Sequence, residues 1–196
     1  MFTQPKKTPS PKMRKLHSIH GLLIGREFIG EIEAGKIRYS FAYSPAAAAI
    51  SNGKLELSGR FAVKSSGGQN RKSDNVKATL LATQSGLTTA PQAPRGMEAT
   101  LLGKLPTDGL PATDATGGRG YVGVMYFRLS PLDGRSLGLP FELNAVQLNA
   151  RLNPSDHTAD ALQFWYSVAV RALYDPIPDG ALASKSLTEI NQLLKV

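Results

Sequence analysis

Three histidines have the residue type and spacing that could bind a metal or act as a base. His17 and His20 stand three residues apart in HSIHG, and His157 follows Asp156 in NPSDHTAD. Zinc sites need three or four ligands, and the chain contains no cysteine, so two neighbouring imidazoles supply too few. NPSDHTAD is typical of a turn with solvated charges. The histidines therefore predict neither a metal site nor a catalytic pair.

Two short motifs resemble parts of enzyme active sites. GRSLG, residues 134–138, matches the G-x-S-x-G nucleophile motif, with Ser136 as the nucleophile. That motif requires a sharp strand-to-helix turn, whereas SPLDGRSLGLP indicates a loop between strands. TGGRG, residues 116–120, has the glycines of a phosphate-binding loop, but they lead into a strand and not into a helix N-terminus. We therefore expect no enzyme and no cofactor, with an enzyme built on Ser136 as the weaker alternative.

RGYVGVMY, residues 119–126, partly matches the strand with which an RNA-recognition domain stacks bases. Arg119, Tyr121 and Tyr126 fit, but Gly123 stands where the second stacking aromatic is needed. No amphipathic helix precedes this segment, although that domain packs two helices behind its sheet. The motif therefore predicts a buried central strand entered through a glycine-rich turn.

The positive charge is concentrated in two segments. The formal net charge is +8, residues 1–26 contain six basic residues and no acid, and residues 54–77 contain six basic residues against two acids. The residues expected to contact a partner or an anion are Lys6, Lys7, Lys12, Arg14, Lys15, Lys64, Arg71 and Lys72. Clustered cations with Gln and Asn between them suit phosphates or an acidic surface. The alternative is a solvated hairpin tip.

The chain is expected to form one domain with two appendages. Residues 1–18, rich in Pro and Lys, predict a flexible arm, residues 19–175 one β domain, and residues 176–196 a connector and a helix. No apolar run reaches the ~20 residues that span a bilayer. Residues 12–25 lack a small-residue cleavage site, so we expect no signal peptide and a cytoplasmic location.

Alternating apolar residues predict strands with one buried face. In KIRYSFAYS the inward side is Ile37, Tyr39, Phe41 and Tyr43, and in GKLELSGRFAVK it is Leu55, Leu57, Phe61 and Val63. Residues 121–129 are apolar on both faces, as in a central strand. Along residues 141–152 the alternation changes phase, which predicts a bulge near Asn144 and Ala145.

The last third of the chain is ambiguous between helix and strand. Residues 161–173 fill one face in a strand alternation and are rich in aromatic and β-branched residues, so we predict a strand. Trp165 would then point to the outer face, either under the C-terminal helix or as an interface aromatic. Ser186 and Glu189 form a capping-box pattern that predicts a short helix beginning there.

Many short strands separated by turn-rich segments at 65–75, 85–96 and 106–120 predict an all-β fold. We expect an antiparallel sandwich or jelly-roll-like barrel of about seven to nine strands with a short C-terminal helix. The leading functional hypothesis is a non-catalytic interaction or assembly subunit, homo- or hetero-oligomeric, whose arm orders on a partner. The alternatives are a nucleic-acid-binding or coat-like protein and a carrier of an apolar ligand.

Overall fold

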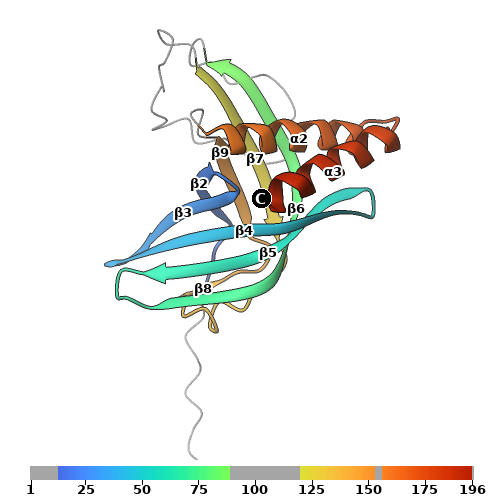
Figure 1. Ribbon diagram of the computed structural model, residues 1–196. Coiled ribbons are helices and arrows are strands. Elements are labelled where there is room, and N and C mark those ends of the chain that lie inside the picture. Colours follow the sequence, from blue (N-terminus) through green and yellow to red (C-terminus); the bar gives the residue numbers. More distant parts are fainter. Residues whose placement is uncertain (1–12, 89–119, 153–155, 196) are drawn as a thin grey trace, which may run out of the picture.

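The computed structural model describes residues 13–88, 120–152 and 156–195 and consists of a closed β-barrel with two helices (Figure 1). The barrel strands are β2 (Ser18–Ile24), β3 (Glu27–Ala34), β4 (Ile37–Ser51), β5 (Lys54–Ser65), β6 (Asn70–Thr88), β7 (Gly120–Leu129) and β9 (Gln147–Leu152). Two short strands, β1 (Arg14–Lys15) and β8 (Phe141–Glu142), pair with each other beside the barrel. The predicted β-rich barrel is confirmed in this broad form.

The strand order departs from an all-antiparallel sandwich or jelly roll. From β2 to β7 each strand pairs antiparallel with the next one in the chain, and β9 pairs antiparallel with β7. The barrel closes where β2 pairs parallel with β9, Ser18 opposite Gln147. The sheet is therefore mixed. The expectation of purely antiparallel pairing was wrong because β2 and β9 run in the same direction along the barrel.

Side-chain alternation in β4 and β5 builds the barrel interior as predicted. Tyr39, Phe41 and Tyr43 of β4 are buried, as are the four predicted inward residues of β5, Leu55, Leu57, Phe61 and Val63. Ile37 is the exception at 43% exposed, because it lies at the first position of β4, on the rim. Inside the core, the Tyr43 hydroxyl donates to the carbonyl of Val76, and burial raises the Tyr43 pKa.

The segment predicted as a long loop at 65–75 is mostly strand. The connection between β5 and β6 is a tight turn, in which Ser65 N–H donates to the carbonyl of Gln69, and β6 begins at Asn70. Asn75 has a φ of 58°, where the register of β5 against β6 shifts. The polar composition that indicated a loop belongs to a solvent-facing hairpin with a bulge.

The predicted strand at 161–173 is wrong, because this segment lies inside helix α2 (His157–Tyr174). The Asp156 side chain accepts hydrogen bonds from the N–H groups of Thr158 and Ala159, which starts the helix. The buried residues Ala159, Leu162, Gln163, Tyr166, Ala169 and Ala172 follow helical spacing. The turn expected around Asp156 is thus the N-cap of a helix.

The C-terminal helix is confirmed but begins earlier than predicted. Helix α3 spans Gly180–Lys195, and Asp179 accepts the N–H of Leu182 with its side chain. Ser186, expected to cap the helix, lies inside it and donates its hydroxyl to the carbonyl of Leu182. The capping box of Ser186 and Glu189 was therefore wrong, and the cap is Asp179, the last residue before α3.

The helices close one end of the barrel (Figure 1). Tyr166 of α2 packs edge-on against Phe127 of β7, with ring centroids 5.8 Å apart, and Tyr174 donates its hydroxyl to the carbonyl of Leu80. Asn191 of α3 bonds to both backbone groups of Ala48 in β4. The described helices include none long and apolar enough to cross a membrane.

Residues 130–146 close the opposite end. Leu137, Leu139 and Phe141 from this segment join the same buried core as the barrel interior. Ala145 has a φ of 60°, so the predicted phase change is a turn that separates β8 from β9 and not a bulge in one strand. In β7, residues 124–127 are buried on both faces, which confirms the predicted central strand.

Part of the predicted arm belongs to the fold. β1 pairs in parallel with β8, Arg14 opposite Phe141, and Leu16 N–H donates to the carbonyl of Glu142. Ser18 is already the first residue of β2. Residues 13–18 therefore lie against the barrel, unlike the arm expected to extend to residue 18, and residues 1–12 lie outside the described residues.

Candidate anion-binding end of the barrel

Strand direction brings separated basic segments to one end of the barrel. The start of β2, the β3–β4 turn, the β5–β6 turn and the end of β7 share the end opposite the helices. We call it the basic end. Lys36 of the β3–β4 turn and Arg128 near the end of β7 are exposed there. Six further cations come from β1, the β5–β6 hairpin and the 134–139 turn: Arg14, Lys15, Lys64, Arg71, Lys72 and Arg135. All six are exposed. Five of them were predicted from sequence as partner or anion contacts.

Specific contacts hold these segments beside one another. Arg135 Nε donates to the sulfur of Met13 at 3.2 Å, which joins the 134–139 turn to the residue before β1. The side-chain oxygen of Gln69 lies 3.0 Å from where a β-carbon on Gly138 would stand, so the same turn also lies against the hairpin tip. The turn therefore bridges the β1 cations and the hairpin cations.

Two of the four acids near these cations, Asp74 and Glu33, pair with other arginines. Asp74 pairs with Arg60 at 2.7 Å, and this hydrogen bond lowers the pKa of Asp74. Glu33 pairs with Arg38 at 2.9 Å. Asp133 accepts the N–H of Arg135, and Glu142 lies opposite Lys15 in the β1–β8 register. The basic end thus keeps an excess of exposed positive charge.

Sequence reasoning missed one of these cations and cannot be tested on three others. Lys6, Lys7 and Lys12 lie outside the described residues. Arg135 was missed because GRSLG was interpreted only as a nucleophile motif around Ser136. The available signal was a basic residue in a Gly-rich turn flanked by prolines, which is typical of an exposed tip.

Ser136 lies in a tight turn and not in a nucleophile elbow. Its hydroxyl donates to the carbonyl of Asp133, and Gly138 has a φ of 70°. His157 begins α2 at the opposite end of the barrel. The two residues that a hydrolase would need together are therefore apart.

His20 takes part in a polar network on the outer wall where β2 pairs with β9. Asn149 Nδ2 lies 3.2 Å from His20 Nδ1, and His20 Nε2 lies 3.3 Å from the Ser18 hydroxyl oxygen. Gln147 donates its amide to Asn149 at 2.7 Å. Burial, with Arg151 nearby, lowers the pKa of His20. An amide donor at Nδ1 favours the tautomer with the proton on Nε2, and in that tautomer Nε2 donates to Ser18 and does not act as its base.

The histidines do not assemble a metal centre within the described segments, where no group of three or more His, Asp and Glu side chains comes together. His17 is exposed before β2, and His157 is exposed at the start of α2. In TGGRG, Gly117 and Gly118 lie outside the described residues, and only Gly120, the first residue of β7, is described.

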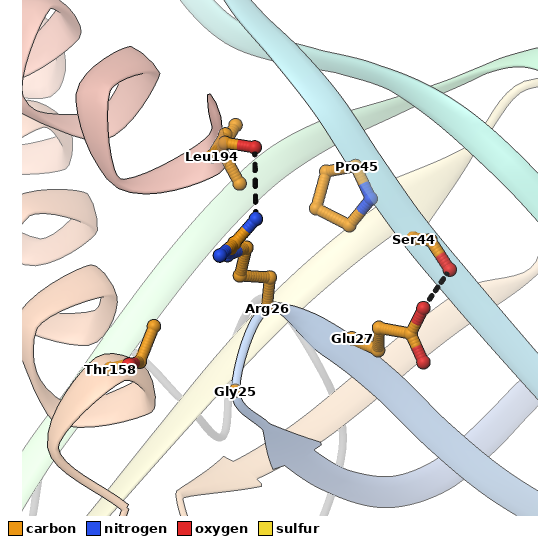
Figure 2. A pocket seen from close by; sticks show the side chains of 7 residues that line it. All are labelled: Gly25, Arg26, Glu27, Ser44, Pro45, Thr158 and Leu194. Carbon is orange, nitrogen blue, oxygen red and sulfur yellow. Dashed lines mark hydrogen bonds between the residues drawn. The ribbon is translucent and has the colours of Figure 1, made fainter. Parts of the chain in front are cut away.

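A pocket of about 390 Å³ lies where α2, α3 and the β2–β3 turn meet (Figure 2). Arg26 extends across it and donates Nη1 to the carbonyl of Leu194 at 3.4 Å. On the other side Ser44 donates to Glu27 at 2.6 Å. A guanidinium on the last carbonyls of a helix stabilises its negative end. The Arg26 hydrogen bond thus attaches the end of α3 to the β2–β3 turn, and the Ser44 hydrogen bond joins β4 to β3.

Asp156 joins the start of α2 to the β2–β3 turn, and its removal is expected to cost more than the loss of a cap alone. Besides capping α2, its carboxylate accepts the N–H of Gly25 in the β2–β3 turn. We expect Asp156→Ala to lower the free energy of unfolding by about 2–3 kcal/mol, of which about 1 kcal/mol is the cap and the rest the charged hydrogen bond to Gly25. Asp179→Ala is the matched control, because Asp179 caps α3 alone. Equal losses in urea unfolding would show that the Gly25 hydrogen bond contributes nothing.

Asp156 also predicts a pH dependence. Hydrogen bonds from Ala159 and Gly25 hold the pKa of Asp156 below its ordinary value of 3.8. The unfolded state therefore binds the proton first as the pH falls, so the Asp156 contribution is complete above that value and is lost below it. Asp156→Asn is expected to flatten this part of the stability profile, measured by urea unfolding across the acidic range. An unchanged acid slope would contradict it.

Trp165 was predicted either as an interface aromatic or as buried under the C-terminal helix, and its side chain is partly buried. It packs against the core, its ring lies 5.1 Å from that of Phe164, and Lys185 Nζ of α3 lies 6.0 Å from its centroid. The neighbouring Phe164 is much more exposed, at 58%. Sequence reasoning missed it because Phe164 counted as an inward residue of a strand.

No family model, no curated protein and no solved structure matches the chain. The structure alone therefore defines the class of protein: a closed mixed β-barrel with helices over one end and exposed cations at the other.

Proposed function

We propose that this protein is a non-catalytic binding module whose basic end holds the phosphate backbone of a nucleic acid. The observation that carries the proposal is the convergence of three separated segments, β1, the β5–β6 hairpin and the 134–139 turn, on one end of the barrel. Each brings at least one exposed cation. Clustered Lys and Arg side chains attract phosphates and release counterions when they bind.

The composition of the hairpin supports phosphate contacts. Neutral donors, Gln69 and Asn70, stand beside Arg71 and Lys72 and are exposed. Amide and hydroxyl groups between cations contribute hydrogen bonds to phosphate oxygens in protein–nucleic acid interfaces. In the described part of the chain Lys64, Arg71 and Lys72 form no salt bridge, so their charges are available to a ligand.

The same end favours binding without base recognition. Among the described residues, the aromatics at this end are Tyr39 and Phe141, which are buried against each other with ring centroids 6.3 Å apart. Sequence-tolerant stacking and base reading both need exposed π-faces or side chains that reach base edges. Affinity is therefore expected to depend on salt and not on sequence.

The test is oligonucleotide binding followed by fluorescence anisotropy between about 50 and 200 mM salt. The full chain is expected to bind with an affinity that falls steeply as salt rises. Arg71→Gln/Lys72→Gln should lower the slope of log K against log salt by about 0.9 for each phosphate that the variant no longer neutralises. Removing residues 1–12 tests whether Lys6, Lys7 and Lys12 bind further phosphates.

The control removes the same charge from the helix end. Lys54 lies beside the β4–β5 turn and Lys195 ends α3, and both are exposed. Lys54→Gln/Lys195→Gln should leave both affinity and slope unchanged. Equal weakening by the two double variants would show that only net charge matters. Equal affinity for polyglutamate would assign the basic end to an acidic protein instead.

The packed core argues against the apolar-ligand carrier hypothesis, whereas an exposed helix face supports the assembly hypothesis. The carrier hypothesis needs interior space, whereas Phe41, Phe61, Leu57, Leu80 and Met125 pack into one core inside the barrel. The assembly hypothesis needs an exposed apolar surface. Helix α2 supplies one, at the end of the barrel away from the cations.

A further inference from the structure

The outer side of α2 carries a stripe of exposed residues with a particular order. His157, Asp160, Phe164, Val168 and Arg171 recur every three or four positions, so they lie on one side of the helix. All are exposed or partly exposed, whereas the opposite side, with Leu162 and Tyr166, is buried on the barrel. The stripe is acidic near the start of α2, apolar in the middle and basic near the end.

An apolar hollow lies next to this stripe, between the end of α2 and the start of α3. It measures about 350 Å³ and is lined by Val168, Ala172, Ile177 and Leu182 together with charged groups. Ile177 is 87% exposed. Phe164 stands one turn from Val168, so an exposed aromatic and an apolar hollow are adjacent on the same surface. Contiguous exposed apolar surface of this kind marks interaction sites.

We propose that a second copy of this chain covers the stripe, with the two α2 helices antiparallel about a two-fold axis midway between Phe164 and Val168. In this arrangement Phe164 of one copy meets Val168 and the hollow of the other. Asp160 faces the partner's Arg171, and His157 faces Asp175 at the end of the partner's α2. Every contact is made twice, as a two-fold interface requires.

The order of charges selects a second copy over an unrelated partner. A stripe with acid at one end and base at the other is complementary to itself reversed. An acid in the first turn of a helix and a base in the last turn also stabilise the helix dipole of a monomer. The dipole alone does not explain why the exposed Phe164 lies between them. The interface is a helix pair and one hollow, so we expect a weak dimer, with a Kd of about 10–100 µM.

The first experiment measures mass in solution by sedimentation across a concentration series, without nucleic acid. The wild-type chain is expected to pass from monomer to dimer. Phe164→Ser should weaken dimerisation at least about tenfold, because it removes the central aromatic. Ile29→Ser is the control, since Ile29 is an exposed apolar residue on the barrel wall. A wild-type monomer at all concentrations, or equal effects of the two variants, would overturn the proposal.

The second experiment tests the register by charge exchange. Asp160→Arg alone and Arg171→Asp alone each place like charges opposite one another, so each should dimerise more weakly than wild type. Asp160→Arg/Arg171→Asp should regain dimerisation, because both pairs are restored in reverse. A mixture of the two single variants should form a heterodimer, since each Asp then faces an Arg. Circular dichroism checks that each variant keeps its helices.

Failure of the double variant and of the mixture to regain dimerisation would overturn the antiparallel register. A dimer in which Phe164→Ser has no effect would place the interface elsewhere and overturn the proposal as a whole. Neither result depends on the basic end, because no cation of that end lies on α2. Self-association and nucleic-acid binding can therefore fail independently.

Discussion

Tyr166→Ala is expected to lower the free energy of unfolding by about 3–5 kcal/mol. The Tyr166 ring is 1% exposed and packs edge-on against Phe127, so it joins α2 to the barrel interior. Alanine would leave a cavity at that junction that neither the helix nor the sheet can fill without moving. Urea unfolding followed by circular dichroism measures the loss.

Two variants isolate the cause of this loss. Tyr166→Phe keeps the ring and should lose much less. Phe164→Ala truncates an aromatic two residues away on the exposed side of α2 and is expected to change stability by no more than about 0.5 kcal/mol. If Tyr166→Ala costs no more than Phe164→Ala, the Tyr166 ring does not stabilise the junction of α2 with the barrel.

Gly21→Ala is expected to destabilise the protein by about 3 kcal/mol or more. A β-carbon on Gly21 would stand 2.0 Å from the carbonyl oxygen of Ile29, and Gly30 lies directly opposite in the β2–β3 register. The obstructing atom belongs to the backbone, so no side-chain rotation relieves the clash. To make room for the β-carbon, β2 must move away from β3, although it is also held by its pairing with β9 on the other side.

Gly180→Ala provides the matched comparison for that substitution. Gly180 is the first residue of α3, and a β-carbon there meets nothing within 4 Å. Alanine at such a site reduces the freedom of the unfolded chain and is expected to be neutral or to stabilise by up to about 1 kcal/mol. A similar loss at both glycines in thermal unfolding would show that close strand contact is not the cause.

Strands with a single buried face could be predicted from the sequence because their side chains alternate regularly. Phe41 and Phe61 illustrate this, since both lie inward as their positions in KIRYSFAYS and GKLELSGRFAVK required. The pairing of strands could not be predicted, because alternation says which side is buried and not which strand is adjacent. The parallel contact of Ser18 with Gln147 has no local signal.

Helix α2 was missed because large apolar residues also alternate along its sequence, as they do in a strand. Leu162, Phe164 and Tyr166 fit one side of a strand, yet Phe164 faces solvent while the other two face the core. The hairpin cations Lys64, Arg71 and Lys72 could be singled out from charge alone. Their proximity to Arg135 could not, because it depends on how the 134–139 turn folds back.

The parallel contact between β2 and β9 also determines when the fold can be completed. During synthesis β2 gains β3 soon after it emerges, but its other edge has no partner until residues 147–152 have left the ribosome. An unpaired edge is open to pairing with another chain. Contacts so distant in sequence form slowly. Closure of the barrel is thus expected to be the slow step of folding. Chains whose synthesis stops before residue 147 are expected to aggregate.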